Sequence, residues 1–135
     1  MKTTYGKLLM LGFLSIFVCC GYYIFLAPSL ARGSLPASAT EIHEHYTDAR
    51  LGADYTRCLK AKVDEAGFEL FANRLGLDQV SDSTNTLIKG IADCDEPWWN
   101  PPQEYVGARF EKADHHFAIA VYHDGYVYFS VRGWQ

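Results

Sequence analysis

Two cysteines beyond the N-terminal stretch, Cys58 and Cys94, are candidates for a disulfide bond because of their positions in the sequence. Cys58 lies on the polar side of an alternating stretch, where a free thiol is unfavourable, and Cys94 lies in a region without a regular pattern. Outside the cytoplasm, cysteines are commonly paired in disulfides. A Cys58–Cys94 bridge would join the irregular region to the alternating stretch and contribute about 3–4 kcal/mol in the chain-entropy picture. The alternative is two separate thiols.

Two histidines add a second candidate chemistry. His43 and His45 are two residues apart, so both point to one face of an extended strand, and Cys58 faces His43 in the strand pairing expected below. Two imidazole nitrogens and one sulfur are ligands that zinc prefers, which makes the three residues a candidate zinc site or metal-dependent catalytic site. Zinc and the disulfide compete for one sulfur. With five histidines in 135 residues, two of them fall close together in the sequence by chance. The alternative is therefore that His43 and His45 are solvated, and we assign no cofactor.

The string WWNPP, which begins at Trp98 and Trp99, is the most unusual in the chain. A stiff, proline-bordered backbone that exposes aromatic rings is a common way to bind peptides or sugar rings. The two tryptophans are therefore candidate binding residues. The alternative is a loop whose tryptophans fold back and close the core.

The charged residues are distributed unevenly, and this excludes one class of function. All 16 acidic residues lie at or beyond Glu41, and ten basic residues stand against them after Lys7. A nucleic-acid binder needs basic groups gathered on one face, so we predict no nucleic-acid partner. The chain contains no G-x-S-x-G, H-E-x-x-H, C-x-x-C or phosphate-binding glycine loop, which favours a protein without enzymatic activity.

The candidate residues follow a long apolar stretch, Leu8–Ala27, which is preceded by Lys7. Twenty helical residues span about 30 Å, the thickness of the hydrocarbon core of a bilayer. We therefore predict a single transmembrane helix that anchors the protein in the cell membrane, with residues 1–7 in the cytoplasm because the basic residues precede it. Two alternatives share this orientation: a signal peptide cleaved near Ala31, which releases the domain, and a lipoprotein modified at a cysteine.

A linker and one folded domain are expected after the apolar stretch. Residues 28–39 are rich in Pro, Ser, Ala and Gly, which predicts a spacer, and the domain then covers residues 40–135 outside the membrane. Asp64–Leu75 is the clearest helix, because Asp64 can cap its first amides and Gly76 suits the residue after its end. The apolar stripe of this helix has i, i+3, i+4, i+7 spacing and consists of Phe68, Phe71, Ala72 and Leu75.

Five stretches have the alternation of strands: 40–47, 54–63, 105–112, 117–122 and 126–131. We expect the first two to pair with Thr47 opposite Asp54, although 40–47 alone also fits an amphipathic helix. For the last two we prefer a three-residue loop that sets Val121 opposite Val127, because it gathers six apolar side chains on one face; a two-residue Asp-Gly turn is the alternative. The predicted fold class is α+β, with a transmembrane helix and about five antiparallel strands in ββαβββ order on one main helix.

Several short strings give the chain a family resemblance: LPASATEI, DYTRCLKAKV, RLGL, WWNPP and DGYVYF. The pattern resembles small exported or membrane-anchored bacterial proteins of unknown function, and it brings no catalytic residues with it. Two hypotheses follow. The first is a non-catalytic binding or structural module outside the membrane, whose partner is an envelope protein or cell-wall component. The second is a zinc-binding or metal-dependent enzymatic domain that uses His43, His45 and Cys58.

Overall fold

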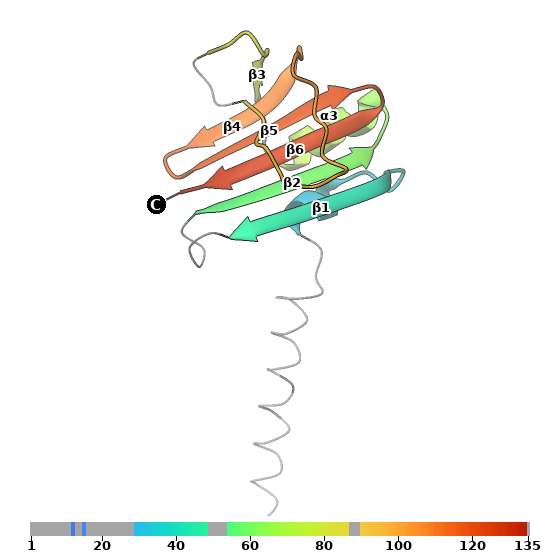
Figure 1. Cartoon of the computed structure of the whole chain (residues 1–135). Coiled ribbons are helices and arrows are strands. Elements are labelled where there is room, and N and C mark those ends of the chain that lie inside the picture. Colours follow the sequence, from blue (N-terminus) through green and yellow to red (C-terminus); the bar gives the residue numbers. More distant parts are fainter. Residues whose placement is uncertain (1–11, 13–14, 16–28, 49–53, 87–89, 135) are drawn as a thin grey trace, which may run out of the picture.

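The computed structural model describes residues 12, 15, 29–48, 54–86 and 90–134. Six strands form one antiparallel sheet in the order β1-β2-β6-β5-β4-β3 (Figure 1). The elements in chain order are α2 (Leu30–Ser34), β1 (Thr40–Asp48), β2 (Tyr55–Lys62), α3 (Glu65–Arg74), β3 (Gln79–Ser81), β4 (Ala108–Ala113), β5 (His116–His123) and β6 (Tyr126–Gly133).

The predicted fold class, α+β with about five strands in ββαβββ order on one main helix, is wrong. The described residues form a mainly β protein, with a six-stranded sheet and two short helices. The strand missing from the prediction is β3, which pairs with β4 at the sheet edge. Its three residues are too few for an alternating pattern, and its one apolar side chain, Val80, is exposed.

The predicted transmembrane helix, Leu8–Ala27, lies outside the described residues apart from Gly12 and Ser15. Among the residues that the structure describes, no helix combines the length and apolar character that a membrane crossing needs. Within the predicted linker, the chain forms α2, which begins after Ser29 and buries Ala31 in the core.

Helix α3 agrees with its sequence signals. The Asp64 side chain accepts a hydrogen bond from the backbone N–H of Gly67 at 2.8 Å, which caps the first turn. Phe68, Phe71 and Ala72 are buried against the sheet, as their spacing predicts. The prediction of this helix is confirmed.

The β1–β2 hairpin is shifted by two residues from the predicted register. Thr47 lies opposite Thr56, not Asp54, and Glu41 adopts a left-handed φ of 51° where the pairing is interrupted by a bulge. Because a shift of two residues preserves the faces of a strand, His43 and His45 still share a face with Cys58. His45, not His43, is directly opposite Cys58.

The preferred register of the β5–β6 hairpin is wrong, and the alternative two-residue turn is found. Ala120 lies opposite Phe129, and both turn residues have positive φ, 50° at Asp124 and 82° at Gly125. This geometry belongs to the type I′ turn that suits Asp-Gly. The preference failed because it assumed one buried sheet face, whereas β5 and β6 bury apolar side chains on both faces.

The two faces of the sheet have different covers (Figure 1). On the helix face, α2 and α3 pack over a cluster whose sheet residues are Leu59, Ala61, Ala118, Ala120, Val127 and Phe129. On the disulfide face, the irregular segment of residues 90–107 crosses in front of the strands. The core on this face consists of two clusters. One contains Ala108, Phe110, Phe117, Ile119 and Val121, and the other contains Cys58, Ala92, Trp99 and Tyr128.

Candidate functional site

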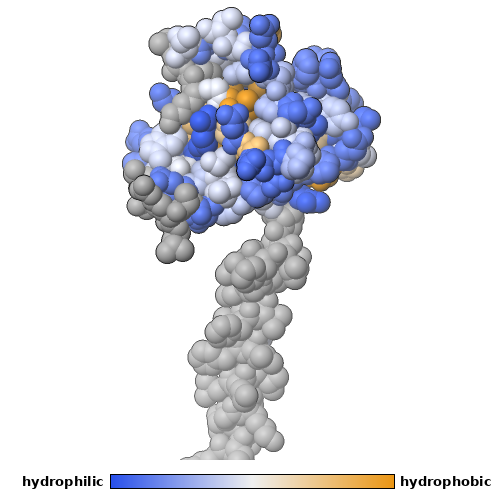
Figure 2. Space-filling view, viewed as in Figure 1, coloured by the Kyte–Doolittle hydropathy of each residue, from blue (hydrophilic) through white to orange (hydrophobic). Residues whose placement is uncertain are grey.

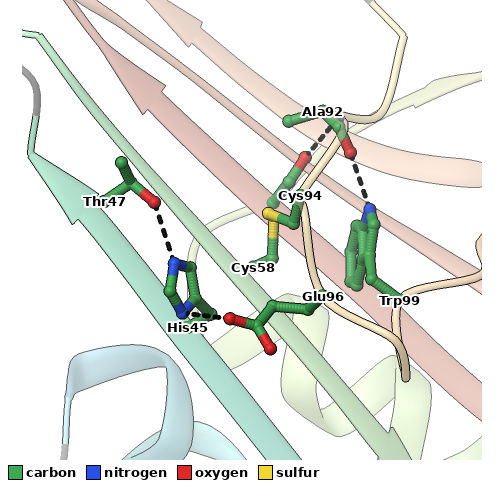
Figure 3. The surroundings of a disulfide bond; sticks show 8 residues. His45, Thr47, Cys58, Ala92, Cys94, Glu96 and Trp99 are labelled. Atoms are coloured by element: carbon green, nitrogen blue, oxygen red, sulfur yellow. Dashed lines mark hydrogen bonds and ion pairs between the residues drawn. A yellow bond between two sulfur atoms is a disulfide. The ribbon is translucent and has the colours of Figure 1, made fainter.

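The disulfide face carries most of the residues singled out in the sequence. Cys58 on β2 and Cys94 in the 90–107 segment form a disulfide, with their Cα atoms 6.5 Å apart (Figure 3). This separation is within the usual range for a bridged pair. The predicted bridge is confirmed, and it fastens the 90–107 segment to the second strand of the sheet.

Hydrogen bonds hold the same segment at a second point. The backbone N–H of Ala92 donates to Ser130 Oγ at 2.9 Å, and Trp99 Nε1 donates to the carbonyl of Ala92 at 2.9 Å (Figure 3). Ala92 is buried, so both of its backbone polar groups need partners inside the protein. Trp99 is itself 9% exposed and packs edge-to-face on Tyr128. Its ring closes the core, which is the alternative that the sequence left open.

The histidines are not assembled into a metal site. Cys58 Sγ is bonded to Cys94, so the sulfur that zinc would need is not a free thiolate. His45 Nδ1 lies 2.8 Å from Glu96 Oε1, and its Nε2 lies 3.0 Å from Thr47 Oγ1. Among the described residues, no group of three or more His, Cys, Asp or Glu side chains is placed to hold a metal ion.

Trp98 is half-buried, because neighbouring side chains cover part of its ring. It stacks on His43, with ring centroids 5.4 Å apart and planes at 21°, and meets Trp99 edge-to-face. Next to it, Lys60 Nζ donates to Asn100 Oδ1 at 2.6 Å and lies over the ring of Tyr126. Figure 2 shows that this side of the molecule is mostly hydrophilic, with only a small apolar area. The predicted pair of exposed tryptophans is therefore one interior residue and one that is partly covered.

A pocket on the helix face was not predicted. A pocket of about 480 Å³, which we call the trough, runs across the strands beside α2 and the end of α3. This volume is in the range of small-molecule sites. Its residues are Ser29, Leu30, Ala31, Tyr46, Tyr55, Arg57, Leu75, Glu111, His116, Ala118, Phe129 and Val131.

The trough exists because α3 is shorter than the strands it covers. A ten-residue helix is about 15 Å long, whereas an eight-residue strand extends about 26 Å. Beyond Leu75 the sheet is not covered by α3; α2 borders the gap, and Phe129, Val131 and Ala118 lie at its floor. The predicted elements held no such signal, because a helix over 64–75, about 18 Å long, nearly matches strands over 117–122 and 126–131, about 20 Å long.

One end of the trough is aromatic and carries a guanidinium. Arg57 Nη1 donates to Glu44 Oε1 at 2.7 Å, and the guanidinium lies 4.9 Å from the centre of the Tyr46 ring. Ser29 Oγ donates to the same carboxylate oxygen, which ties α2 to β1. The rings of Tyr46 and Tyr55 are 6.0 Å apart. Burial, and next the nearby Asp48 carboxylate, raise the pKa of Tyr46 above its usual value.

The other end of the trough is acidic. Glu111 Oε2 on β4 lies 3.4 Å from His116 Nε2 on β5, and both side chains are partly exposed. The two ends therefore differ in the charged group that lines the trough: the guanidinium of Arg57, paired with Glu44 behind it, at one end, and the carboxylate of Glu111 beside an imidazole at the other. Such an arrangement can orient a ligand that has one charged end and an apolar body.

No protein-family model, curated protein or solved structure matches the chain. The resemblance to small exported or membrane-anchored bacterial proteins stays a prediction.

Proposed function

We propose that this protein is a non-catalytic binding module displayed outside the cytoplasmic membrane of a bacterium, with the trough as its binding site. The observation that carries the proposal is the Cys58–Cys94 disulfide, which fastens a whole face of the sheet. Reducing compartments keep thiols reduced, so a fold that relies on such a bridge belongs in an oxidising one.

The N-terminal sequence supports the same location. Leu8–Ala27 is apolar throughout and follows Lys7, and both an uncleaved anchor and a cleaved signal with that polarity deliver the domain to the outer side. The proposal covers both fates of the segment. In either case the domain meets envelope components, which supply its ligand or partner.

The trough supports binding and not catalysis. Its charged groups are paired, Arg57 with Glu44 and Glu111 with His116, and its floor is apolar. The catalytic motifs named above are absent from the chain. An apolar cleft with a few convergent polar groups is the usual form of a ligand site.

Thiol counting in cells tests the location. We would express the full-length Cys19→Ser/Cys20→Ser variant in a bacterial host, quench it in acid, and add a mass-tagging maleimide after denaturation. We expect no tag without reductant and two tags with it, because the two remaining cysteines are bridged. Two tags in both samples would place the thiols in a reducing compartment and refute the proposal.

Protease treatment of spheroplasts provides an independent check. The domain should be digested, or already released to the medium, while a cytoplasmic marker stays intact. Purification of the intact protein under mild conditions should then recover a bound envelope component. A domain protected from protease in intact spheroplasts would contradict the proposal even if the disulfide formed during lysis.

A further inference from the structure

We propose that the trough binds a single-chain anionic amphiphile, a fatty acid or a similar acyl carboxylate, with its head group at Arg57 and its chain along the apolar floor. This inference rests on the proposed function for the location of the site, and its chemistry rests on the trough itself. Three features of the described residues support it: the floor, the charge at each end, and the position of the opening.

The floor suits a hydrocarbon chain. The trough crosses three interstrand spacings from β2 to β4, about 14 Å, and the apolar part of its floor is Phe129 and Val131 on β6 and Ala118 on β5, with Leu75 at its side. Phe129 and Ala118 are only 4% and 5% exposed, so the apolar area that a ligand would remove from water comes from Val131 and Leu75, and from Leu30 at the edge. Covering that area with an apolar chain is favourable in proportion to it.

The charges set the direction of the ligand. A guanidinium has five N–H donors in a planar fork, and the interaction described for Arg57 with Glu44 engages one of its nitrogens. A ligand carboxylate beside it would also approach the Tyr46 and Tyr55 end of the trough. The far end repels an anion because Glu111 is there. The head group therefore belongs at Arg57 and the tail points toward β5.

A peptide fits the same space less well. An extended peptide brings one N–H and one C=O per residue, and each needs a hydrogen-bond partner when it is buried. The floor of the trough is the side-chain face of a sheet, whose backbone groups are used within the strands. An acyl chain has no polar group along its length, so it loses nothing on such a floor.

The position of the trough suits a ligand that comes from the membrane. Ser29, Leu30 and Ala31 line it, and they follow the apolar N-terminal stretch directly in the sequence. Leu30 is 80% exposed at this edge, so it presents an apolar side chain where an acyl chain would enter.

Photolabelling of the full-length protein in host membranes tests the inference. The probe is a palmitate analogue with a diazirine in mid-chain, and its methyl ester is the uncharged comparison. After irradiation, the purified protein is digested and labelled peptides are quantified by mass spectrometry. We expect the acid to label the peptide that contains Val131 at least fivefold more strongly than the ester does.

Matched variants locate the label. Val131→Trp fills the floor and should reduce labelling of the domain at least fivefold, whereas Val106→Trp, at a side chain that is 84% exposed away from the trough, should leave it unchanged. Arg57→Gln should remove the preference for the acid. Because the comparison of acid with ester needs no variant, the test stays decisive if Arg57→Gln fails to fold.

Three results would overturn the inference: equal labelling by acid and ester, label confined to the N-terminal stretch, or a protein partner or second copy cross-linked at the β6 peptide in place of the probe. None of these three results contradicts the proposed function, provided that the cysteines are found bridged and the domain is found outside the membrane. A reduced domain inside the cell would refute the proposed function without bearing on the affinity of the trough for an acyl chain.

Discussion

The two faces of the sheet are closed in different ways. On the disulfide face, a segment with no regular secondary structure is fixed to the strands by the Cys58–Cys94 bond and by the hydrogen bonds of Ala92. On the helix face, α3 is held mainly by the packing of apolar side chains, with Phe71 fully buried, and at its surface Arg109 donates to Glu69 and Asn73. The irregular cover places the ring of Trp99 in the core, whereas α3 is shorter than the strands and leaves the trough beside it.

This difference explains why each face has its own means of stabilisation. A helix satisfies its own backbone hydrogen bonds, so packing and a few side-chain contacts are enough to hold it on an apolar surface. An irregular segment must find partners for its backbone groups one by one, as Ala92 does with Ser130 and Trp99. A covalent bond offsets the conformational entropy that such a segment loses, in the chain-entropy picture.

The largest expected effect is on the helix face. Phe71→Ala removes a fully buried ring that meets Phe129 edge-to-face, with centroids 5.6 Å apart. We expect the free energy of unfolding to fall by about 4 kcal/mol, measured by urea denaturation with the disulfide intact. Leu70→Ala, at a side chain on the same helix that is 41% exposed, is the control and should cost less than about 0.5 kcal/mol. Equal effects would mean that packing does not hold this cover.

The next effect is on the disulfide face. Cys58→Ala/Cys94→Ala opens a loop with a sequence separation of 36 residues and should lower the free energy of unfolding by about 3–4 kcal/mol. Hydrogen exchange should speed up at Trp99 and Ala92 before it does in α3, because the segment loses its covalent attachment.

The control for that variant is Cys19→Ala/Cys20→Ala, which also removes two thiols but lies outside the domain. It should leave the unfolding of the domain unchanged. If exchange in α3 accelerated as much as at Trp99, the two covers would open together and the contrast between the faces would fail.

A smaller effect separates the two tryptophans. Trp99→Phe removes the donor to the Ala92 carbonyl and leaves a smaller ring in a buried site, which should cost about 2 kcal/mol. Trp98→Phe keeps an aromatic ring on His43 at a partly exposed site and should change stability by less than about 0.5 kcal/mol. Thermal unfolding of both variants checks this, and a reversed order would contradict the account of the 90–107 segment.

The sequence predicted the parts of the fold that local signals determine. The cap at Asp64 and the stripe of Phe68, Phe71 and Ala72 sufficed for α3, because a helix is specified within its own residues. The disulfide was also predictable, because Cys58 falls on the polar side of its alternating stretch, where a bridge is more favourable than a free thiol.

What could not be predicted depends on contacts between distant segments. The predicted β5–β6 register gathers apolar residues on one face. In the structure the 90–107 segment covers the second face, and no local sequence pattern indicates that this face is buried. The trough needs the relative lengths of α3 and the strands together with the correct register, so it emerges only from the assembled sheet.

The smallest effect concerns an electrostatic contact at the edge of the disulfide face. Glu41 Oε2 accepts a hydrogen bond from the Tyr126 hydroxyl at 2.6 Å, and Glu41 Oε1 lies 3.2 Å from Lys62 Nζ. The hydrogen bond from Tyr126, followed by that from Lys62, lowers the pKa of Glu41 below its usual 4.5. The same contacts with Glu41 raise the pKa values of Tyr126 and Lys62 above 10.0 and 10.5.

These directions set a pH window. The lowered pKa of Glu41 stabilises the folded state above about pH 4.5, and this stabilisation is lost as pH falls through the pKa that Glu41 has in the folded protein. The raised pKa values of Tyr126 and Lys62 stabilise the folded state below about pH 10, and this stabilisation is lost as pH rises through their pKa values in the folded protein. The difference in melting temperature between wild type and Glu41→Gln should therefore be greatest between about pH 5 and pH 9 and narrow on both sides. Glu104→Gln, at an exposed glutamate, is the control. A difference independent of pH would mean that Glu41 contributes through the shape of the β1 bulge and not through its charge.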